Sequence, residues 1–372
     1  MNARPRISTA PGSTLAATLD VLVDSALGPA RVLPALHTED WPDPTAAAAL
    51  PQELWEQALG DVARDMLGRP SRQFRARLCG LAWRLAGGGG DVPRLLAAVV
   101  EIVHAGSLIV DDIEDASVVR RGAPAAHVTH GVPRALNAAN WMYFWALDLI
   151  DDLTTSSPAT RNALRRALTR TMHDCHLGQA LDVSIPVGML PRTLVYRTVA
   201  TSTMLKTGAL MEFAARGAAL AAEAEPKQIE ALARFGRRLG LGLQMLDDFG
   251  NLTAPASDSE GSKALEDLRG GRPTWPWALA AQELDDPTFS ELQRNVRELV
   301  AFKDAGGSAD GADAALARAL AAKLRMAVGL RGRQQATAYL HRALADLRRA
   351  VGDRPELTQV AAEIQRLEHS YG

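Results

Sequence analysis

The stretch "LIVDDIEDASVVRRG", Leu108–Gly122, decides the fold and the kind of site that this sequence predicts. An almost continuous apolar run ends in four acidic residues within five positions, and Arg120 and Arg121 follow. On a helix, Asp111 and Asp115 lie one turn apart and point the same way, with Asp112 beside them. Like charges at this spacing repel, so the segment predicts a buried helix that ends at a cation-binding site.

A second acidic cluster follows the same pattern in "LGLQMLDDFGN", Leu241–Asn251. Asp247 and Asp248 close an apolar helix, and Asn251 comes four residues after Asp247. If both helices end on the same side of a bundle, the two clusters could face each other. Oxygen-only ligand sets suit Mg²⁺, which keeps several waters and usually shares its sites with substrate phosphates. A solvated acidic helix end is the alternative, but the apolar turns before both clusters disfavour it.

Hydrophobic periodicity elsewhere is that of helices, and alternating strand patterns are almost absent. We predict an all-α protein, a single multi-helix bundle from residue 51 to 372 around a central apolar cavity, preceded by a partly irregular N-terminal extension, residues 1–50. A loop is predicted from Phe302. The segments with helical patterns are 53–67, 72–86, 92–112, 133–152, 159–183, 192–222 and 226–249, with several more after Thr274.

Composition excludes several classes of protein. The formal net charge of the 372 residues is -2, so no overall field favours nucleic acid or anionic lipid. Two cysteines give no disulfide framework and suit a reducing cytoplasm. No apolar run reaches the roughly 18 residues of a spanning helix, and no secretory signal is recognisable at the N-terminus. We therefore expect a soluble, cytoplasmic protein with no stable membrane insertion and no nucleic-acid partner.

Cationic side chains recur at positions that could meet an anion. Arg72 and Arg75 lie about one turn apart, and Arg272 follows two glycines. Lys206 lies between apolar neighbours and before Thr207, where burial without an anion is costly. Metal-binding acids and many cations without an overall basic charge indicate a polyanionic small molecule, and diphosphates fit.

Taken in order, these motifs resemble the trans-isoprenyl diphosphate synthases, also called polyprenyl synthetases, from about Leu54 to Pro276. The first aspartate-rich motif and its arginine pair appear as "DDIEDASVVRRG", and "QxxDD" appears at Gln244–Asp248. The family's "GKxxR" appears as "SRQFR", "KT" stands at Lys206-Thr207, and "DLxxGKxT" becomes "DLRGGRPT". His104 stands seven residues before the first aspartate, and "GQALD" makes Gln179 and Asp182 second-rank candidates.

The resemblance implies a reaction and a role for each residue. An allylic prenyl diphosphate would ionise and condense with isopentenyl diphosphate, giving a longer trans-prenyl diphosphate, of about C20. Mg²⁺ would be the cofactor, three ions with substrate bound, and the protein would be a homodimer. The implied metal ligands are Asp111, Asp112, Asp115, Asp247 and Asp248. The implied catalytic residues are Asp111, Asp115, Arg120, Lys206 and Asp247. Isopentenyl diphosphate would be held by Arg72, Arg75, His104 and Arg121, and the allylic substrate by Arg120, Lys206, Thr207, Gln244 and Arg272.

The sequence departs from the family pattern at a few positions. Asn251 stands where a third acid is usual, arginines at 72 and 272 replace lysines, and Ala138–Asn140 lies where a "GD" pair is often found. The residues one turn before Asp111, Ser107 and Gly106, are small, while Val103 and Val100 lie deeper. We expect an aromatic residue of "NWMYFWAL", Asn140–Leu147, to form the floor of the tail pocket. C15 or longer products stay open.

Other functions are compatible with parts of the sequence. A class I terpene cyclase would ionise the same substrate without adding an isopentenyl unit, and Asp258, Ser262 and Glu266 match the spacing of its second metal motif. Retention of Arg75, His104 and Arg121 argues against it, because a cyclase needs no second diphosphate site. Glu101 and His104 form one iron-type pair without the second that a di-iron site needs. "HDCH", His173–His176, has no partner motif. A non-catalytic regulatory subunit is the remaining alternative. Loss of both acidic motifs would indicate such a subunit, but the first motif is complete here.

Overall fold

The computed structural model describes residues 14–28, 50–153, 156–253, 265–305 and 312–370. The chain divides into two compact units. Unit 1 consists of Met1–Thr169 with Leu220–Glu223, and unit 2 of Arg170–Ala219 with Ala224–Gly372. The prediction of one domain from residue 51 onward stays a prediction.

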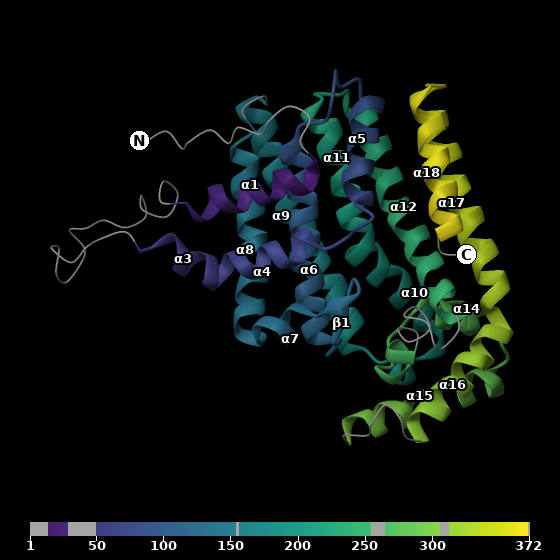
Figure 1. Ribbon diagram of the computed structural model, residues 1–372. Helices are drawn as coiled ribbons and strands as arrows, with labels where there is room; N and C mark the ends of the chain where they lie inside the picture. The colour runs from purple at the N-terminus through teal and green to yellow at the C-terminus, as the bar shows by residue number, and fades with distance from the viewer. Residues whose placement is uncertain (1–13, 29–49, 154–155, 254–264, 306–311, 371–372) are drawn as a thin grey trace. The chain divides into compact units, whose positions relative to one another are not determined.

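Helices make up most of the described part of unit 1 (Figure 1). Its elements are α1 Leu15–Leu27, α3 Gln52–Trp55, the π-helical η4 Glu56–Gly60, α4 Asp61–Gly68, α5 Phe74–Leu85, α6 Arg94–Glu114, α7 Ala126–His130 and α8 Val132–Asp151. Two strands of two residues each, β1 Val119–Arg120 and β2 Ala123–Pro124, pair antiparallel between α6 and α7. The helix α9, Pro158–Ser184, begins in unit 1 and continues into unit 2.

Helices make up most of the described part of unit 2. Its elements are η5 Val187–Met189, α10 Arg192–Thr203, the π-helical η6 Met204–Gly208, α11 Ala209–Ala221 (which ends in unit 1), α12 Pro226–Thr253, α14 Trp275–Glu283, α15 Asp286–Asp304, α16 Ala312–Leu324, the π-helical η7 Arg325–Gly329, α17 Leu330–Val351 and α18 Glu356–Ser370. The all-α prediction is confirmed. In the parts of the chain that the structure describes, no helix has both the length and the apolar character to cross a membrane.

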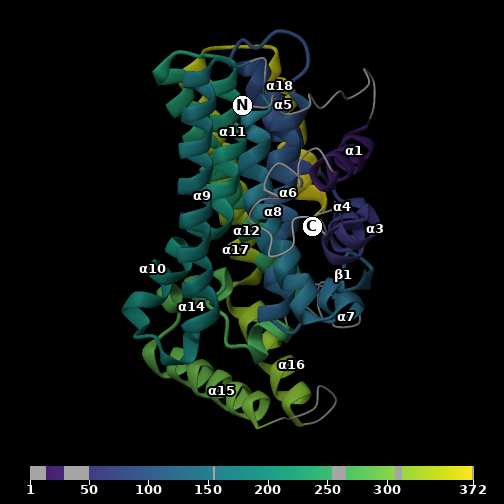
Figure 2. The same cartoon turned by 90° about the vertical axis from the view of Figure 1, so that its left-hand side faces the viewer.

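The core of unit 1 is the contact between α6 and α8 (Figure 2). Ile102 and Ile109 on α6 and Met142 on α8 are fully buried, and each contributes about 2 kcal/mol through removal of apolar surface from water. Gly106 permits the close approach, because a β-carbon there would lie 3.1 Å from the carbonyl oxygen of Ala139. The helix that carries the first acidic motif is thereby held rigidly.

The helix α1 was not predicted from the sequence, which was interpreted there as part of a partly irregular extension. Thr14 caps it by accepting a hydrogen bond from the amide of Ala17 at 3.3 Å. Leu19, Leu22, Val23 and Leu27 are buried. A helix of 13 residues is only marginally stable alone, so burial of these side chains, and not the local sequence, stabilises α1.

In unit 2, α12 packs along α17 (Figure 1). The predicted continuous helix at 192–222 is interrupted at η6, which carries Lys206 and Thr207. Single π-helical turns inside α-helices occur frequently at functional sites. The loop predicted from Phe302 starts later, since α15 continues to Asp304. Residues 306–311 lie outside the described residues, and α16 begins at Ala312.

Candidate active site

Each unit carries a group of the predicted site residues. Unit 1 holds the first acidic motif, the arginine pair, Arg72, Arg75 and His104. Unit 2 holds the second acidic motif, Lys206, Thr207, Gln244 and Arg272.

The first acidic motif stands at the C-terminal end of α6, with Asp115 as the C-cap. This end of a helix carries partial negative charge, so acidic residues there need a cation. Asp112 is buried at 1% exposure, while the side chain of Asp111 is 19% exposed. Burial raises the pKa of Asp112, and its hydrogen bond with Arg120 opposes that effect.

Arg120 is held by the acidic motif. Its Nε donates to Asp112 Oδ1 at 2.7 Å, its Nη2 contacts the same oxygen, and Nη2 lies 3.6 Å from Asp111 Oδ2. The other oxygen of Asp112, Oδ2, is buried and has no hydrogen-bond partner among the described residues. Asp112 therefore orients the first arginine of the pair.

The arginine pair sits in a hairpin between β1 and β2. Arg121 and Gly122 form the two-residue turn, with φ of 54° and 76°, and Arg120 pairs with Ala123. A turn with both central residues at positive φ matches the twist of short strands, and glycine suits its second position. Arg121 adopts this conformation at a cost of roughly 1–2 kcal/mol, which the surroundings of the hairpin must offset.

His104 and Arg75 lie in direct contact. Arg75 Nη1 and His104 Nε2 are 2.9 Å apart. Burial, followed by the charges of Arg75, Arg121 and Arg120, holds the pKa of His104 well below its usual range. The imidazole is therefore neutral near pH 7, with Nε2 accepting from the guanidinium and Nδ1 left to carry the ring proton. Arg72 lies just before α5, with an exposed side chain.

Glu101 is a functional candidate that the sequence indicated only as a possible iron ligand. It is buried, accepts a hydrogen bond from the amide of Ala76 at 3.2 Å, and its charge favours the charged form of Arg121. Both members of the Glu101–His104 pair thus have partners on α5, which argues against iron. The sequence signal that could have identified Glu101 is an acid within an apolar helix, three residues before the predicted ligand His104.

In unit 2, η6 presents Lys206 to Asp182 of α9. Lys206 Nζ lies 2.7 Å from Asp182 Oδ2, and the side chain of Lys206 is 32% exposed. Arg272 donates from Nη1 to the carbonyl oxygen of Asp182 at 2.8 Å. Asp182, which the sequence ranked second, therefore joins two of the predicted cations. Gln179 lies one turn earlier on α9 and is half-buried.

The second acidic motif is linked to Thr207 by a chain of hydrogen bonds. Thr207 Oγ1 donates to Gln244 Oε1 at 3.0 Å, and Gln244 Nε2 donates to Asp248 Oδ1 at 2.8 Å. The other oxygen of Asp248 accepts from the amide of Trp275, the first residue of α14, at 2.9 Å. Asp248 thus has both oxygens engaged.

Asp247, the other acid of this motif, contacts Asn251. Asn251 Nδ2 donates to Asp247 Oδ2 at 3.3 Å, so the amide that replaces the usual acid orients the preceding carboxylate. Asp248 and Asn251, with Asp267, line a small pocket of about 20 Å³ in unit 2.

The donors fit Mg²⁺ in kind, because carboxylate oxygens are the ligands this hard cation prefers. Within the described residues, no group of three or more His, Cys, Asp or Glu side chains is arranged to hold a metal by itself. The "HDCH" segment is a polar helix face: His173 and His176 are exposed, and His176 Nδ1 bonds the carbonyl oxygen of Met172 at 2.8 Å. Asp258 and Ser262 lie outside the described residues.

An all-α fold with acidic helix ends beside arginine and lysine side chains defines the class of isoprenoid synthases. A family model described as polyprenyl synthetase matches residues 56–305, and the chain belongs to that family. It is a trans-prenyltransferase by this membership.

Individual relatives agree with the family assignment. The geranylgeranyl pyrophosphate synthase of Eremothecium gossypii is 31% identical over 243 residues, which are 63% of this chain and 74% of the relative. Geranylgeranyl pyrophosphate synthase 2 of Zymoseptoria tritici is 32% identical over 242 residues, 63% of this chain and 68% of the relative. The crystal structure of a polyprenyl synthase from Caulobacter crescentus, complexed with calcium and isoprenyl diphosphate, has the same fold. Its TM-score is 0.67 at 24% identity, covering 84% of this chain and 88% of that one.

Proposed function

We propose that this trans-prenyltransferase condenses an allylic prenyl diphosphate with isopentenyl diphosphate to a product of about C20. The observation that carries the proposal is the group of Arg75, His104 and Arg121 in unit 1, next to an Arg120 already engaged by Asp112. A single diphosphate would not need both this group and the separate set proposed for the allylic substrate, which includes Arg120. A cyclase, which binds a single diphosphate, would have no use for the second set.

The metal ligands that we propose are Asp111 and Asp115 in unit 1, and Asp247 in unit 2. Mg²⁺, when bound, supplies a Lewis acid that withdraws electrons from the leaving diphosphate, and three ions are expected with substrate. We assign Asp112 and Asp248 other parts: Asp112 orients Arg120 in unit 1, and Asp248 joins Gln244 to α14 in unit 2. The neutral Asn251 helps to aim Asp247.

The cations of this chain would bind and neutralise the two diphosphates. Arg120, Lys206, Thr207, Gln244 and Arg272 serve the allylic substrate, and Arg72, Arg75, His104 and Arg121 serve isopentenyl diphosphate. The allylic carbon–oxygen bond breaks and its electron pair leaves with the diphosphate. The double bond of isopentenyl diphosphate then forms the new carbon–carbon bond, and a proton is lost to the departing diphosphate. Preorganised cations stabilise the charge that develops on the leaving group.

The product length rests on relatives and on α8. Both relatives named above are geranylgeranyl pyrophosphate synthases, which supports C20. Among the aromatics expected to form a floor, Tyr143 is buried, and a β-carbon at Gly106 would lie 3.2 Å from its ring. Phe144 points outward and is 68% exposed, so it is excluded. Tyr143 is the floor residue that we favour.

A homodimer is supported by the outer face of α8. Val132, Leu136 and Phe144 are exposed at 44%, 38% and 68%, and they recur at helical spacing along one face. Three large apolar residues on one face of a helix mark an interaction surface better than single exposed ones do. A cytoplasmic location rests on the cysteine content of the sequence alone.

The test is product analysis with C5, C10 and C15 allylic diphosphates, each with and without isopentenyl diphosphate, in Mg²⁺ and after chelation. The proposal expects a longer diphosphate that requires both isopentenyl diphosphate and Mg²⁺. Cyclic hydrocarbon or alcohol formed without isopentenyl diphosphate would indicate a cyclase. Absence of turnover with every substrate, in folded protein, would indicate a non-catalytic subunit.

A further inference from the structure

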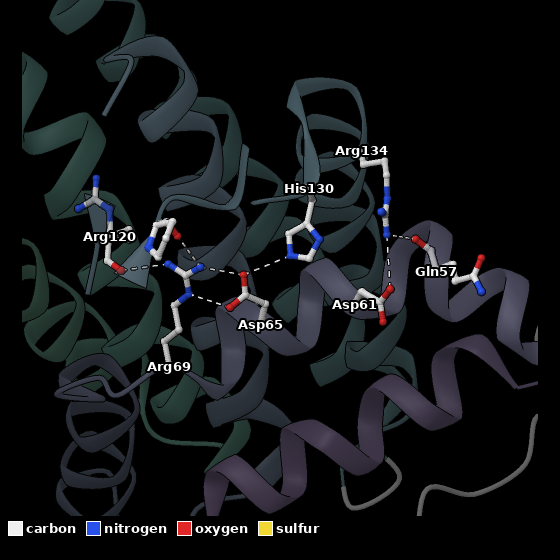
Figure 3. Close-up of polar contacts among 8 residues, drawn as sticks. Gln57, Asp61, Asp65, Arg69, Arg120, His130 and Arg134 are labelled. Atoms are coloured by element: carbon white, nitrogen blue, oxygen red, sulfur yellow. Dashed lines mark hydrogen bonds and ion pairs between the residues drawn. The ribbon is translucent and has the colours of Figure 1, made fainter. Parts of the chain in front are cut away.

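Arg69 makes contacts that no motif of the sequence predicts (Figure 3). Its side chain is 5% exposed and follows α4 directly. Nε and Nη2 donate to the two oxygens of Asp65 at 3.0 and 2.7 Å. Nη1 donates to the carbonyl oxygen of Arg120 at 3.0 Å, and Nη2 also donates to that of Pro124 at 2.8 Å. One buried guanidinium thus joins α4 to both strands of the arginine hairpin.

Asp65 fixes that guanidinium in turn. The pair is bidentate, which defines the orientation of the planar guanidinium as well as its position. Asp65 Oδ2 also lies 3.3 Å from Nε2 of His130, at the end of α7, the helix that follows β2 (Figure 3). The segment is therefore anchored at β1, at β2 and at α7, all through Asp65 and Arg69.

The hairpin needs such an anchor. Its strands have two residues each, and a two-stranded hairpin is marginally stable in water even when longer. It also contains Arg121 at a φ of 54°. Carbonyl oxygens on both strands of this hairpin accept from Arg69.

We propose that Arg69, clamped by Asp65, is a positioning residue of the active site that fixes the backbone of the arginine hairpin and so aims Arg121 at the diphosphate of isopentenyl diphosphate. This rests on the proposed function, in which Arg121 binds that substrate. Arg69 itself touches no substrate.

The two arginines of the hairpin depend on Arg69 to different degrees. Arg120 has a second anchor, because Asp112 holds its guanidinium. Among the described residues, no hydrogen bond fixes the Arg121 side chain. The charge of Glu101 acts on it, but the backbone of the turn is its main constraint. Loss of Arg69 therefore weakens the use of isopentenyl diphosphate more than that of the allylic substrate.

The experiment compares Arg69→Met with Arg134→Met in the full-length protein. Arg134 is a matched control: it also pairs with an acid of α4, with 3.5 Å from Nη2 to Asp61 Oδ2, and contacts the carbonyl oxygen of Gln57, but it does not touch the hairpin (Figure 3). We expect Arg69→Met to raise KM for isopentenyl diphosphate about tenfold and KM for the allylic substrate less than threefold. Arg134→Met leaves both within twofold.

A double-mutant cycle with Arg121→Met separates positioning from general destabilisation. If Arg69 acts through Arg121, adding Arg69→Met to Arg121→Met changes KM for isopentenyl diphosphate less than twofold. Full additivity of the two changes in KM would overturn the proposal. Should Arg69→Met fail to fold, Arg69→Lys and Asp65→Asn replace it. Each is expected to raise the same KM by a smaller factor, and an unchanged KM in both would also overturn it.

Hydrogen exchange of the peptide that spans residues 118–125 gives a readout independent of turnover. Arg69→Met accelerates exchange in this peptide, and Arg134→Met does not. Unchanged exchange refutes the anchoring. A wild-type enzyme that never uses isopentenyl diphosphate refutes the proposed function instead, whatever the exchange shows.

Discussion

Arg120 and Asp112 form a close ion pair in which Nε of the arginine donates to Oδ1 of the carboxylate at 2.7 Å. The acid belongs to the motif that the sequence predicts as a metal site, yet it is 1% exposed and already holds a cation. The two adjacent acids therefore differ: Asp112 is buried against Arg120, whereas Asp111 is more accessible to a metal ion. Asp111 is partly exposed, and its Oδ2 lies 3.6 Å from the same guanidinium.

The first prediction separates these two acids. Asp111→Asn removes a proposed metal ligand and is expected to lower kcat roughly 100-fold or more, the usual effect of losing one stabilising group, and to raise the Mg²⁺ concentration for half-maximal rate. Asp112→Asn keeps an acceptor for Arg120 and should cost about tenfold with an unchanged Mg²⁺ requirement. Steady-state rates across a Mg²⁺ titration measure both. Equal shifts of the Mg²⁺ requirement would contradict the assignment.

The second prediction concerns pH and His104. Its pKa in the folded protein lies below the unfolded value of about 6.5. As the pH falls below 6.5, the unfolded chain takes up the proton first, so stability is full above this pH and declines towards the folded pKa. The slope is at most about 1.4 kcal/mol per pH unit. Urea unfolding at pH 7.5, 6.5 and 5.5 should show that the free energy of unfolding falls less steeply with pH in His104→Asn than in the wild type. Parallel declines in the two proteins would mean that His104 is not held neutral.

The third prediction concerns product length. Tyr143→Ala opens space beside α6 one turn before Asp111 and should lengthen the product by one or more isoprene units. Tyr143→Phe keeps the ring and serves as the control. Chromatography of the dephosphorylated products decides. Unchanged products from Tyr143→Ala would place the floor elsewhere.

The fourth prediction tests Asp182, which holds Lys206 Nζ at 2.7 Å. Asp182→Ala leaves the ammonium without that partner, so the orientation towards the leaving diphosphate that we propose for it is lost. We expect kcat to fall at least tenfold, because small misplacements of a catalytic group are costly. Glu212→Gln, which removes a charge paired with Arg216 and Arg237 in the same unit, is the control with little effect. Wild-type kcat in Asp182→Ala would remove this residue from the site.

The fifth prediction tests the homodimer. Leu136→Asp with Phe144→Asp puts two charges on the apolar face of α8 and should give a monomer in light scattering coupled to size exclusion. Met326→Asp changes another apolar residue, 79% exposed in unit 2, and should leave the mass unchanged. A dimer that survives the paired substitution would show that this face is not the interface.

The fold class was predicted correctly from local features of the sequence, and the candidate site residues were chosen from the same features. Apolar residues at spacings of three and four predict helices wherever the signal is long, as in α6, α8 and α12. The acids and cations are visible because their types and spacings recur within a few residues. The helix α1 and the break at η6 were missed, because packing decides the first and propensity does not distinguish a π-helical turn from an α-helical one.

The sequence by itself determined that this chain is a bundle of helices with acidic helix ends and cations that suit diphosphates. Only the tertiary structure decided which of these groups hold one another. Lys206 contacts Asp182, which is 24 residues away in the sequence. Arg69 donates to the carbonyl oxygens of Arg120 and Pro124, which are 51 and 55 residues away. The physical reason is that helical periodicity is set by neighbours along the chain. A hydrogen bond between distant residues instead requires their helices to pack so that donor and acceptor lie roughly 2.7–3.2 Å apart.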